Sequence, residues 1–249
     1  MRATAIGIDI GGTGIKGGLV DVLSGEIIGD RVRVATPAGG EPEDIVRVTR
    51  EVIKELGADA NVPVGICFPS SVHHGVTMLA ANISQRWIGF EAEKYFEEVL
   101  GRDIHFVNDA DAAGFAEVVY GSAKDQKGLV IMTTLGTGIG AALIYDGILI
   151  PNAELGHLEI DGFDAEKRAS GVVREREGLS YAEWAKRLQR YYSHVEMLLS
   201  PELFIVGGGV SKSHEKFLPL LDLRTPIIPA KLLNKAGIMG AARLAYDFA

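Results

Sequence analysis

Apolar residues gather in short runs that end at glycine, and these runs predict buried strands. The first run, residues 3–10, reads ATAIGIDI and stops at Gly11-Gly12-Thr13-Gly14. Its short length and its isoleucines favour a strand over a helix. Similar runs predict further strands over 15–22, 26–34, 62–68, 105–107, 129–134, 139–145 and 203–206. Strands therefore run into glycine at three places, near residues 11, 136 and 208.

Apolar residues spaced three or four positions apart predict helices between these strands. Over 43–56, Val48 and Val52 belong to such a series, and Gly57 stands just past its end, which is a typical stop signal. Residues 69–90 lack either period and are expected to be irregular. Helices are also predicted over 91–100, 109–117 and 235–248.

The clearest helix covers residues 180–199. Ser180 and Glu183 match a capping box at its start. Its apolar stripe, expected to face the core, comprises Tyr181, Trp184, Leu188, Tyr191, Val195 and Leu198. Because strands and helices alternate around three glycine junctions, the pattern predicts two related α/β lobes.

Composition narrows the class of protein. The 249 residues are 47% apolar and 23% charged, which is typical of a globular chain. A formal net charge of -8 argues against nucleic acid as a partner. Cys67 is the single cysteine, so an internal disulfide and a cysteine-rich zinc site are excluded. The chain shows no signal-peptide pattern and no apolar run of membrane-spanning length, so we expect a cytoplasmic protein with no membrane partner.

The first glycine junction has the residues of a phosphate-binding turn. Gly11 and Gly12 let backbone N–H groups approach an anion, and Thr13 and Lys16 add a hydroxyl donor and a positive charge. Asp9, at the predicted strand end, can hold a hydrated Mg²⁺. The alternative is a plain glycine hairpin with a surface lysine, but the acid before and the lysine after it favour the phosphate turn.

A second group of polar residues follows the strand predicted at 105–107. Asp109 is a candidate general base, because a hydroxyl that attacks phosphorus must lose its proton. Asn108 and Asp109 are also typical helix N-cap residues, and Asp111 suits a first-turn acid. Both interpretations can hold together.

The remaining glycine junctions are candidate donor-binding segments, although glycine hairpins without a ligand are common. They comprise Thr134, Gly136, Thr137 and Gly138 in one segment and Gly207, Gly208 and Gly209 in the other. The second precedes a predicted helix, whose N-terminus could face an anion. Glu154 and His157 could hydrogen-bond vicinal sugar hydroxyls, while a structural histidine is the alternative.

Taken in order along nearly the whole chain, these segments resemble the ROK family of bacterial sugar kinases and repressors. The resemblance implies an α/β, actin-like (ribonuclease H-like) ATPase fold with two lobes and a central cleft. The implied lobes are residues 1–108, with the helix 235–249 packing back on them, and residues 109–234. The helix-turn-helix domain of the family's repressors would precede Asp9, where this sequence has no room for it.

The resemblance also implies roles for the site residues. Asp109 would deprotonate the 6-hydroxyl of a hexose, and Asp9 would organise Mg²⁺. The turn from Gly11 to Lys16 and the later glycine segments would hold the phosphoryl donor. The sugar ligands implied by the resemblance are Asn82, Asn108, Asp109, Glu154 and His157.

One departure from the family pattern concerns zinc. Typical members carry three cysteines after the Glu-x-Gly-His segment, and these bind zinc together with the histidine. The corresponding region here has no cysteine, so zinc is not expected. The acidic sugar ligand that follows the third cysteine is left open among Glu159, Glu175 and Glu177.

The cysteine-free region resembles one branch of the family, the polyphosphate glucokinases and polyphosphate/ATP glucomannokinases. So do the stretches SPELFIVGGGVSK and LRTPIIPAKLLNKAGIMGAA. The branch implies a homodimer and a glucose kinase that uses inorganic polyphosphate, ATP or both. Mannose as a second substrate, an ATP-only kinase and a non-catalytic sugar-binding protein remain alternatives. Candidates for an outer polyphosphate track are Lys124, Lys127, Lys212 and Lys216, each also typical of a solvated lysine.

Overall fold

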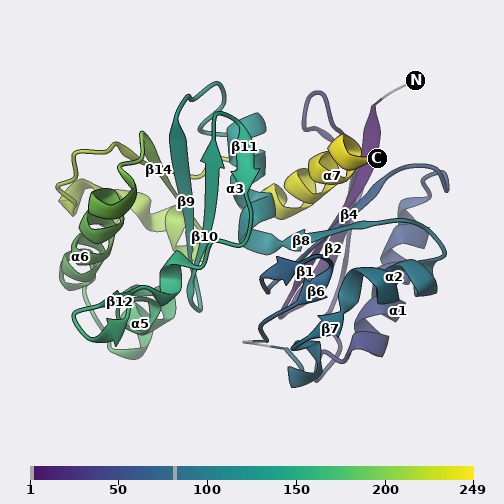
Figure 1. The fold of residues 1–249 in the computed structure, drawn as a ribbon, viewed down its shortest axis with the longest axis horizontal. Coiled ribbons are helices and arrows are strands. Elements are labelled where there is room, and N and C mark those ends of the chain that lie inside the picture. Colours follow the sequence, from purple (N-terminus) through teal and green to yellow (C-terminus); the bar gives the residue numbers. More distant parts are fainter. Residues whose placement is uncertain (1–2, 81–82) are drawn as a thin grey trace. The chain divides into compact units, whose positions relative to one another are not determined.

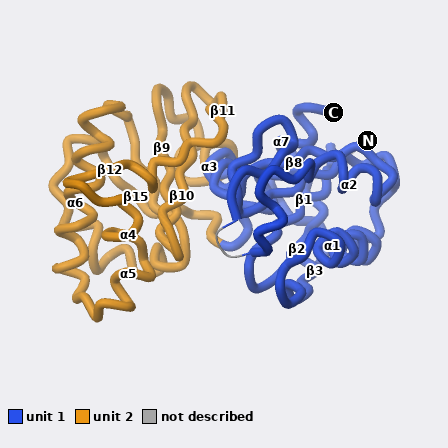
Figure 2. The backbone as a smooth tube through the Cα atoms, turned by 60° about the horizontal axis from the view of Figure 1, so that its bottom comes forward, with its two compact units in different colours: residues 1–116, 234–249 blue, residues 117–233 orange. Residues whose placement is uncertain are grey.

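A computed structural model describes residues 3–80 and 83–249. The chain forms two compact units (Figure 2). One comprises residues 1–116 and 234–249, and the other comprises residues 117–233. The lobes predicted from the sequence would divide between residues 108 and 109, eight residues before the first boundary of these units.

The first unit is built on a five-stranded mixed sheet in the order β3-β2-β1-β4-β8. The hairpin strands β1 (Thr4–Gly11), β2 (Gly14–Asp21) and β3 (Ile27–Val34) are antiparallel. Strands β4 (Val64–Phe68) and β8 (His105–Asn108) run parallel to β1. All five residues of β4 are buried, as a strand at the interior of a covered sheet requires.

Helices cover both faces of this sheet. On one face lies α1 (Pro42–Leu56), whose buried residues include Val48 and Val52 and which ends at Gly57 in the left-handed conformation. On the other face lies α7 (Ala236–Phe248), which packs on β1, β2, β4 and β8 (Figure 1). The unit also holds α2 (Ala92–Leu100) and the start of α3 (Asp109–Val119).

The region predicted to be irregular, 69–90, holds more order than expected. It contributes β5 (Val72–His73), β6 (Val76–Thr77) and the 3₁₀ turn η1 (Gln85–Trp87). With β7 (Phe90–Glu91), the two strands form a three-stranded sheet. Strands of two residues leave no periodic pattern in a sequence, and Trp87, fully buried, holds this sheet to the core.

The second unit repeats the strand order of the first. Its sheet runs β11-β10-β9-β14-β15, with an antiparallel hairpin followed by parallel strands. The strands are β9 (Leu129–Leu135), β10 (Ile139–Tyr145), β11 (Ile148–Ile150), β14 (Leu203–Gly207) and β15 (Ile227–Pro229). Two units with one sheet topology explain why glycine junctions recur along the sequence.

The helix α6 (Tyr181–Leu199) packs on the second sheet and begins with the predicted capping box. The predicted stripe is wrong at its end, because Leu198 is 52% exposed. Tyr192 is buried instead, and its hydroxyl lies 2.6 Å from the hydroxyl of Thr133. A buried polar group satisfied by a distant strand cannot be recognised from helical spacing alone.

Short elements join these parts of the second unit. They are η2 (Leu155–His157), β12 (Glu159–Ile160), β13 (Phe163–Asp164), α4 (Glu166–Ala169), α5 (Gly171–Arg176), η3 (Gly209–Lys216) and η4 (Leu218–Leu220). The turn η5 (Leu233–Lys235) leads into α7. The helix predicted after Gly207–Gly209 is the 3₁₀ element η3, with a kink at Ser213. Among the residues described, no helix has the length and apolar character needed to cross a membrane.

Candidate active site

The β1–β2 hairpin brings Asp9 and Lys16 together. The two residues pair across the hairpin, and Lys16 Nζ lies 2.8 Å from Asp9 Oδ2. Both side chains are partly buried, while Gly12 and Thr13 at the tip of the turn are exposed. The acid and the lysine that the sequence singled out therefore flank an exposed glycine turn.

The buried thiol of Cys67 lies on the strand between those that lead to Asp9 and Asp109. Cys67 lies on β4, between β1 and β8, and its Sγ is 4.0 Å from Asp9 Oδ1. Burial raises the pKa of this thiol well above its ordinary value, and the nearby carboxylates of Asp9 and Asp109 raise it further. Asp9 pairs with Cys67 across β1 and β4, and Cys67 pairs with Val107 on β8, two residues before Asp109. Both acids therefore lie at the carboxyl ends of parallel strands on either side of β4, an edge at which α/β sheets bind ligands.

Asn108 caps the helix that carries Asp109. Its Oδ1 accepts a hydrogen bond of 3.0 Å from the Asp111 backbone N–H, and its Nδ2 donates one of 3.0 Å to the Ser70 carbonyl. The N-cap alternative is thus confirmed for Asn108. These contacts hold Asp109 at the first position of α3, at the junction with β8.

The second unit brings its two glycine segments side by side. Strand β14 runs parallel to β9, and Gly207 pairs with Thr134. Gly208, with φ +82°, lies against Leu135, where a side chain would stand 2.6 Å from the Leu135 carbonyl oxygen. Gly136 faces open space, and its backbone N–H donates to Gly138 O at 3.0 Å. The exposed side chain of Thr137 completes this turn.

The Glu154–His157 segment packs against the same turn. A Cβ on Gly156 would stand 2.2 Å from the carbonyl oxygen of Ile139, so only glycine lets η2 approach β10 this closely. Glu154 is half-buried and precedes η2, while the side chain of His157 is 46% exposed.

Two acids that the sequence interpretation missed lie beside His157. His157 Nδ1 is 3.1 Å from Asp164 Oδ2, and Asp164 Oδ1 accepts a 3.2 Å hydrogen bond from the Glu166 backbone N–H. Glu166 Oε2 in turn accepts a 3.1 Å hydrogen bond from the backbone N–H of Ile139. Little in the sequence marks Asp164 and Glu166 as neighbours of His157, because acids at the end of a short hairpin are common.

The three acids proposed from the sequence lie in other contacts. Glu177 Oε2 is 2.7 Å from Arg187 Nη2, Glu175 forms a 3.6 Å ion pair with Arg174, and Glu159 is exposed on β12. Sequence spacing could not select among the three, because it does not show which side chains the fold places beside His157. Asn82 lies outside the described residues.

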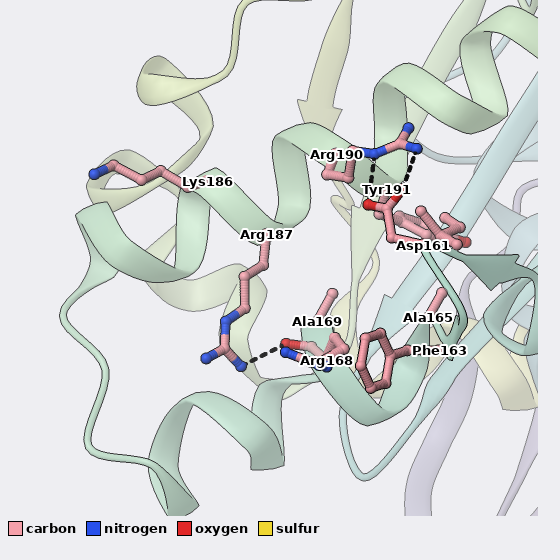
Figure 3. A pocket seen from close by; sticks show the side chains of 10 residues that line it. Asp161, Phe163, Ala165, Arg168, Ala169, Lys186, Arg187, Arg190 and Tyr191 are labelled. Carbon is pink, nitrogen blue, oxygen red and sulfur yellow. Dashed lines mark hydrogen bonds and ion pairs between the residues drawn. The ribbon is translucent and has the colours of Figure 1, made fainter.

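The β12–β13 hairpin, which carries Asp164, is fastened to α6. Arg190 donates two hydrogen bonds to Asp161, of 2.9 and 2.7 Å, and Arg168 stacks 3.6 Å from the ring centre of Phe163 (Figure 3). A cavity of about 280 Å³ lies between hairpin and helix. These contacts hold in place the hairpin that carries Asp164.

We expect a neutral residue at position 164 to lower the pKa of His157. The hydrogen bond to Asp164 raises that pKa above its ordinary value, and nearby Glu166 and Glu154 add to the effect. A raised pKa means that the pair stabilises the fold fully below the unfolded histidine's pKa, and that this contribution is lost as the pH rises through the folded value. NMR titration of the imidazole in Asp164→Asn checks the direction.

Asp161→Asn is the matched control, since it removes a carboxylate from the same hairpin that contacts Arg190 rather than His157. Equal His157 titration curves for wild type and Asp164→Asn would contradict this interpretation of the pair.

Among the residues that the structure describes, two places are candidates for binding a metal ion. Asp9 provides one carboxylate, which suits Mg²⁺, an ion that keeps several waters and binds through one or two carboxylates plus phosphate oxygens. In the described part of the chain, the group His157, Asp164 and Glu166 has ligand atoms all within 4.8 Å of one another. The absence of zinc therefore stays a prediction, and this group is where a metal assay would test it.

Comparisons with known proteins agree on one family. The ROK family profile matches residues 5–172. A polyphosphate glucokinase from Mycobacterium tuberculosis is 46% identical over 237 residues, which cover 95% of this chain and 89% of the relative. The inorganic polyphosphate/ATP-glucomannokinase structure from Arthrobacter sp. strain KM matches with a TM-score of 0.91 and 53% identity over 98% of both chains.

A more distant structure, the ROK family glucokinase from Streptomyces griseus in complex with glucose and AMPPNP, matches with a TM-score of 0.81. It is 26% identical, and the match covers 98% of this chain and 99% of the other. The agreement thus extends along the whole chain, including the cysteine-free region.

Proposed function

Since this chain belongs to the ROK family, we propose that it is a hexose kinase that phosphorylates glucose at the 6-hydroxyl with inorganic polyphosphate, ATP or both. Its fold is the actin-like ATPase fold predicted from the sequence. The predicted resemblance to polyphosphate glucokinases and glucomannokinases is also confirmed. The relatives' names support glucose as the acceptor, and the Arthrobacter enzyme's name supports mannose as a second one.

One observation carries the proposal. Asp9 and Asp109 are 100 positions apart in the sequence, yet strand pairing brings both to one edge of the first sheet: Asp9 pairs with Cys67 on β4, and Cys67 pairs with Val107, two residues before Asp109. Phosphoryl transfer needs a group to take the hydroxyl proton and groups to hold the phosphates and their cation. The first unit offers both within a single cluster.

In the first unit, we assign the proton transfer to Asp109. Its carboxylate accepts the proton of the sugar 6-hydroxyl as that oxygen attacks the terminal phosphorus of the donor. The bridging P–O bond of the donor breaks in the same step, and the shortened polyphosphate or ADP leaves with the bond's electron pair. Asn108 holds the sugar. Asn108 is fixed by two hydrogen bonds, so it is already oriented before sugar binds. Asn82 is a further candidate sugar ligand. The transferred phosphate contacts the backbone N–H groups of the β1–β2 turn, namely Gly11, Gly12 and Thr13, together with the Lys16 ammonium.

The second unit contributes further sugar and donor ligands. Glu154 and His157 hydrogen-bond sugar hydroxyls, and Asp164 holds Nδ1 of His157 so that Nε2 is available. The donor contacts Thr134, Gly136, Thr137, Gly138, Gly207, Gly208 and Gly209, which adjoin one another in this unit. We propose that the two compact units are the two lobes of the kinase, with the boundary after residue 116 rather than after residue 108.

A divalent cation is part of the proposed reaction, and Mg²⁺ is our assignment. Asp9 would hold it through its water shell, in place of the present contact with Lys16. When bound, the cation neutralises charge on the donor phosphates. Cytoplasmic location and a homodimeric state also belong to the proposal, supported by the single buried cysteine and by the resemblance, respectively.

A coupled assay for glucose 6-phosphate, run with polyphosphate and with ATP separately, tests the function. We expect product with polyphosphate, and activity that is lost to EDTA and restored by Mg²⁺ alone. Product with ATP only would replace the proposal by an ATP-only ROK glucokinase. Glucose binding without product from either donor would indicate a non-catalytic sugar-binding protein, and restoration by Zn²⁺ alone would contradict the metal assignment.

A further inference from the structure

The edge of the first sheet holds a basic pocket beside the phosphate turn. It has a volume of about 490 Å³ and is lined by Lys16, Asp30, Arg31, Val32, Arg33 and Asn234. All of these residues belong to the first unit. Of them, only Lys16 belongs to the proposed donor site.

Strand alternation explains why the cations gather there. Lys16 pairs with Arg33 across β2 and β3, and paired residues project to the same face of a sheet. The next positions, Gly17 and Val32, point to the opposite face, where Val52 of α1 lies against Gly17. Lys16 and Arg33 therefore lie together on the face away from α1.

Arg33 reaches the phosphate turn itself. A Cβ on Gly14 would stand 3.1 Å from Arg33 Nε and 3.2 Å from Nη2, so the guanidinium lies directly against the turn. The side-chain stem of Arg31 lies over Gly18, with Cγ 3.9 Å from where a Cβ would be. The two arginines thus extend from the turn along the edge strand β3.

Arg31 and Arg33 differ in their ion pairing from the arginines of the pocket between the β12–β13 hairpin and α6. There Arg190 is neutralised by Asp161 (Figure 3), and Arg187 is neutralised by Glu177. Neither Arg31 nor Arg33 forms an ion pair with any residue that the structure describes. An unpaired pair of guanidinium groups beside a phosphate turn is suited to phosphate oxygens, which they bind in bidentate fashion.

We propose that Arg31 and Arg33, with Lys16 and Asn234, bind the trailing phosphates of a polyphosphate chain whose end lies at the β1–β2 turn. This inference rests on the proposed function and names the residues along which the polyphosphate lies, which we call the polyphosphate track. Polyphosphate carries negative charge on every phosphate, whereas ATP continues into a nucleoside beyond its third phosphate. The track therefore favours polyphosphate over ATP. Asp30 is the one carboxylate that lines the pocket, and its negative charge repels the polyphosphate.

The test compares the KM for long-chain polyphosphate with that for ATP in the variant Arg31→Gln/Arg33→Gln. We expect the KM for polyphosphate to rise about tenfold, because each exposed charged contact contributes up to about fivefold. The KM for ATP and the kcat at saturating polyphosphate should change less than about twofold. In wild type, affinity should increase with chain length and fall with added salt, and both dependences should weaken in the variant.

Two further variants sharpen the result. Arg47→Gln/Lys54→Gln removes the same charge from exposed positions on α1, across the sheet, and should behave as wild type. Asp30→Asn should lower the KM for polyphosphate, an effect that general loss of stability cannot produce.

The inference and the proposed function fail in different ways. If wild type uses polyphosphate while the arginine variant keeps its KM and its chain-length dependence, the track is wrong and the kinase assignment stands. If wild type makes no glucose 6-phosphate, titration calorimetry with polyphosphate alone decides the track, because binding needs no turnover. Equal affinity of wild type and the arginine variant in that titration overturns the inference.

Discussion

Asp109→Asn should lower kcat by about 100-fold or more, the usual contribution of a general base. An asparagine amide cannot accept the hydroxyl proton, although it occupies the same volume at the start of α3. Because the lost interaction belongs to the transition state, kcat and kcat/KM should fall together. Glucose affinity, measured by titration calorimetry, should change far less than kcat, since the asparagine amide can still hydrogen-bond a sugar hydroxyl.

The control for this variant is Asp103→Asn, which removes an exposed carboxylate shortly before β8 in the same unit. It should keep wild-type turnover. An Asp109→Asn protein that is folded and turns over at a near wild-type rate would refute the assignment of the base, and the search for it would move to another acid.

Gly65→Ala should reduce the free energy of unfolding by about 3 kcal/mol or more, the upper range for overpacking a core. A Cβ at this position would stand 1.9 Å from the carbonyl oxygen of Ala241 and 2.4 Å from its carbonyl carbon. Both atoms are backbone of α7, so no side-chain rotation relieves the clash and the helix must move off β4. Urea unfolding measures the loss.

Hydrogen exchange locates the effect of this substitution, because two units need not unfold as one. Amides of α7 and β4 should exchange faster, while those of α6 in the second unit should not change. Gly209→Ala is the matched control, since a Cβ there has open space around it. Equal stability of Gly65→Ala and wild type would show that α7 is not held in place by close contact with the sheet.

Local patterns were sufficient for most of the helices and strands. The capping box of Ser180 and Glu183 and the stop at Gly57 depend on residues within one turn, and the structure has both. The contact between Asp9 and Lys16 also depends on nearby residues, because hairpin pairing alone brings Lys16 next to Asp9. Such features depend on backbone geometry that neighbouring residues determine.

Other features depend on parts of the chain that are far apart in sequence. Asp164 meets His157 only because the β12–β13 hairpin folds back onto η2. Gly65 and Ala241 come into contact across 176 positions, and neither has a local pattern that indicates it. Sequence spacing selected Glu159, Glu175 and Glu177 as candidates, whereas the fold brings Asp164 and Glu166 to the histidine.

By itself the sequence determined most of the longer strands and helices, the glycine turns with their flanking acids, and the family, because each follows from residues close together or from motifs in order. Only the tertiary structure decided which acid contacts His157, that Asp9 and Asp109 share the surroundings of Cys67, and that Arg33 lies against Gly14. These contacts arise from strand order and from the packing of separate elements, and no short-range pattern of residues encodes them.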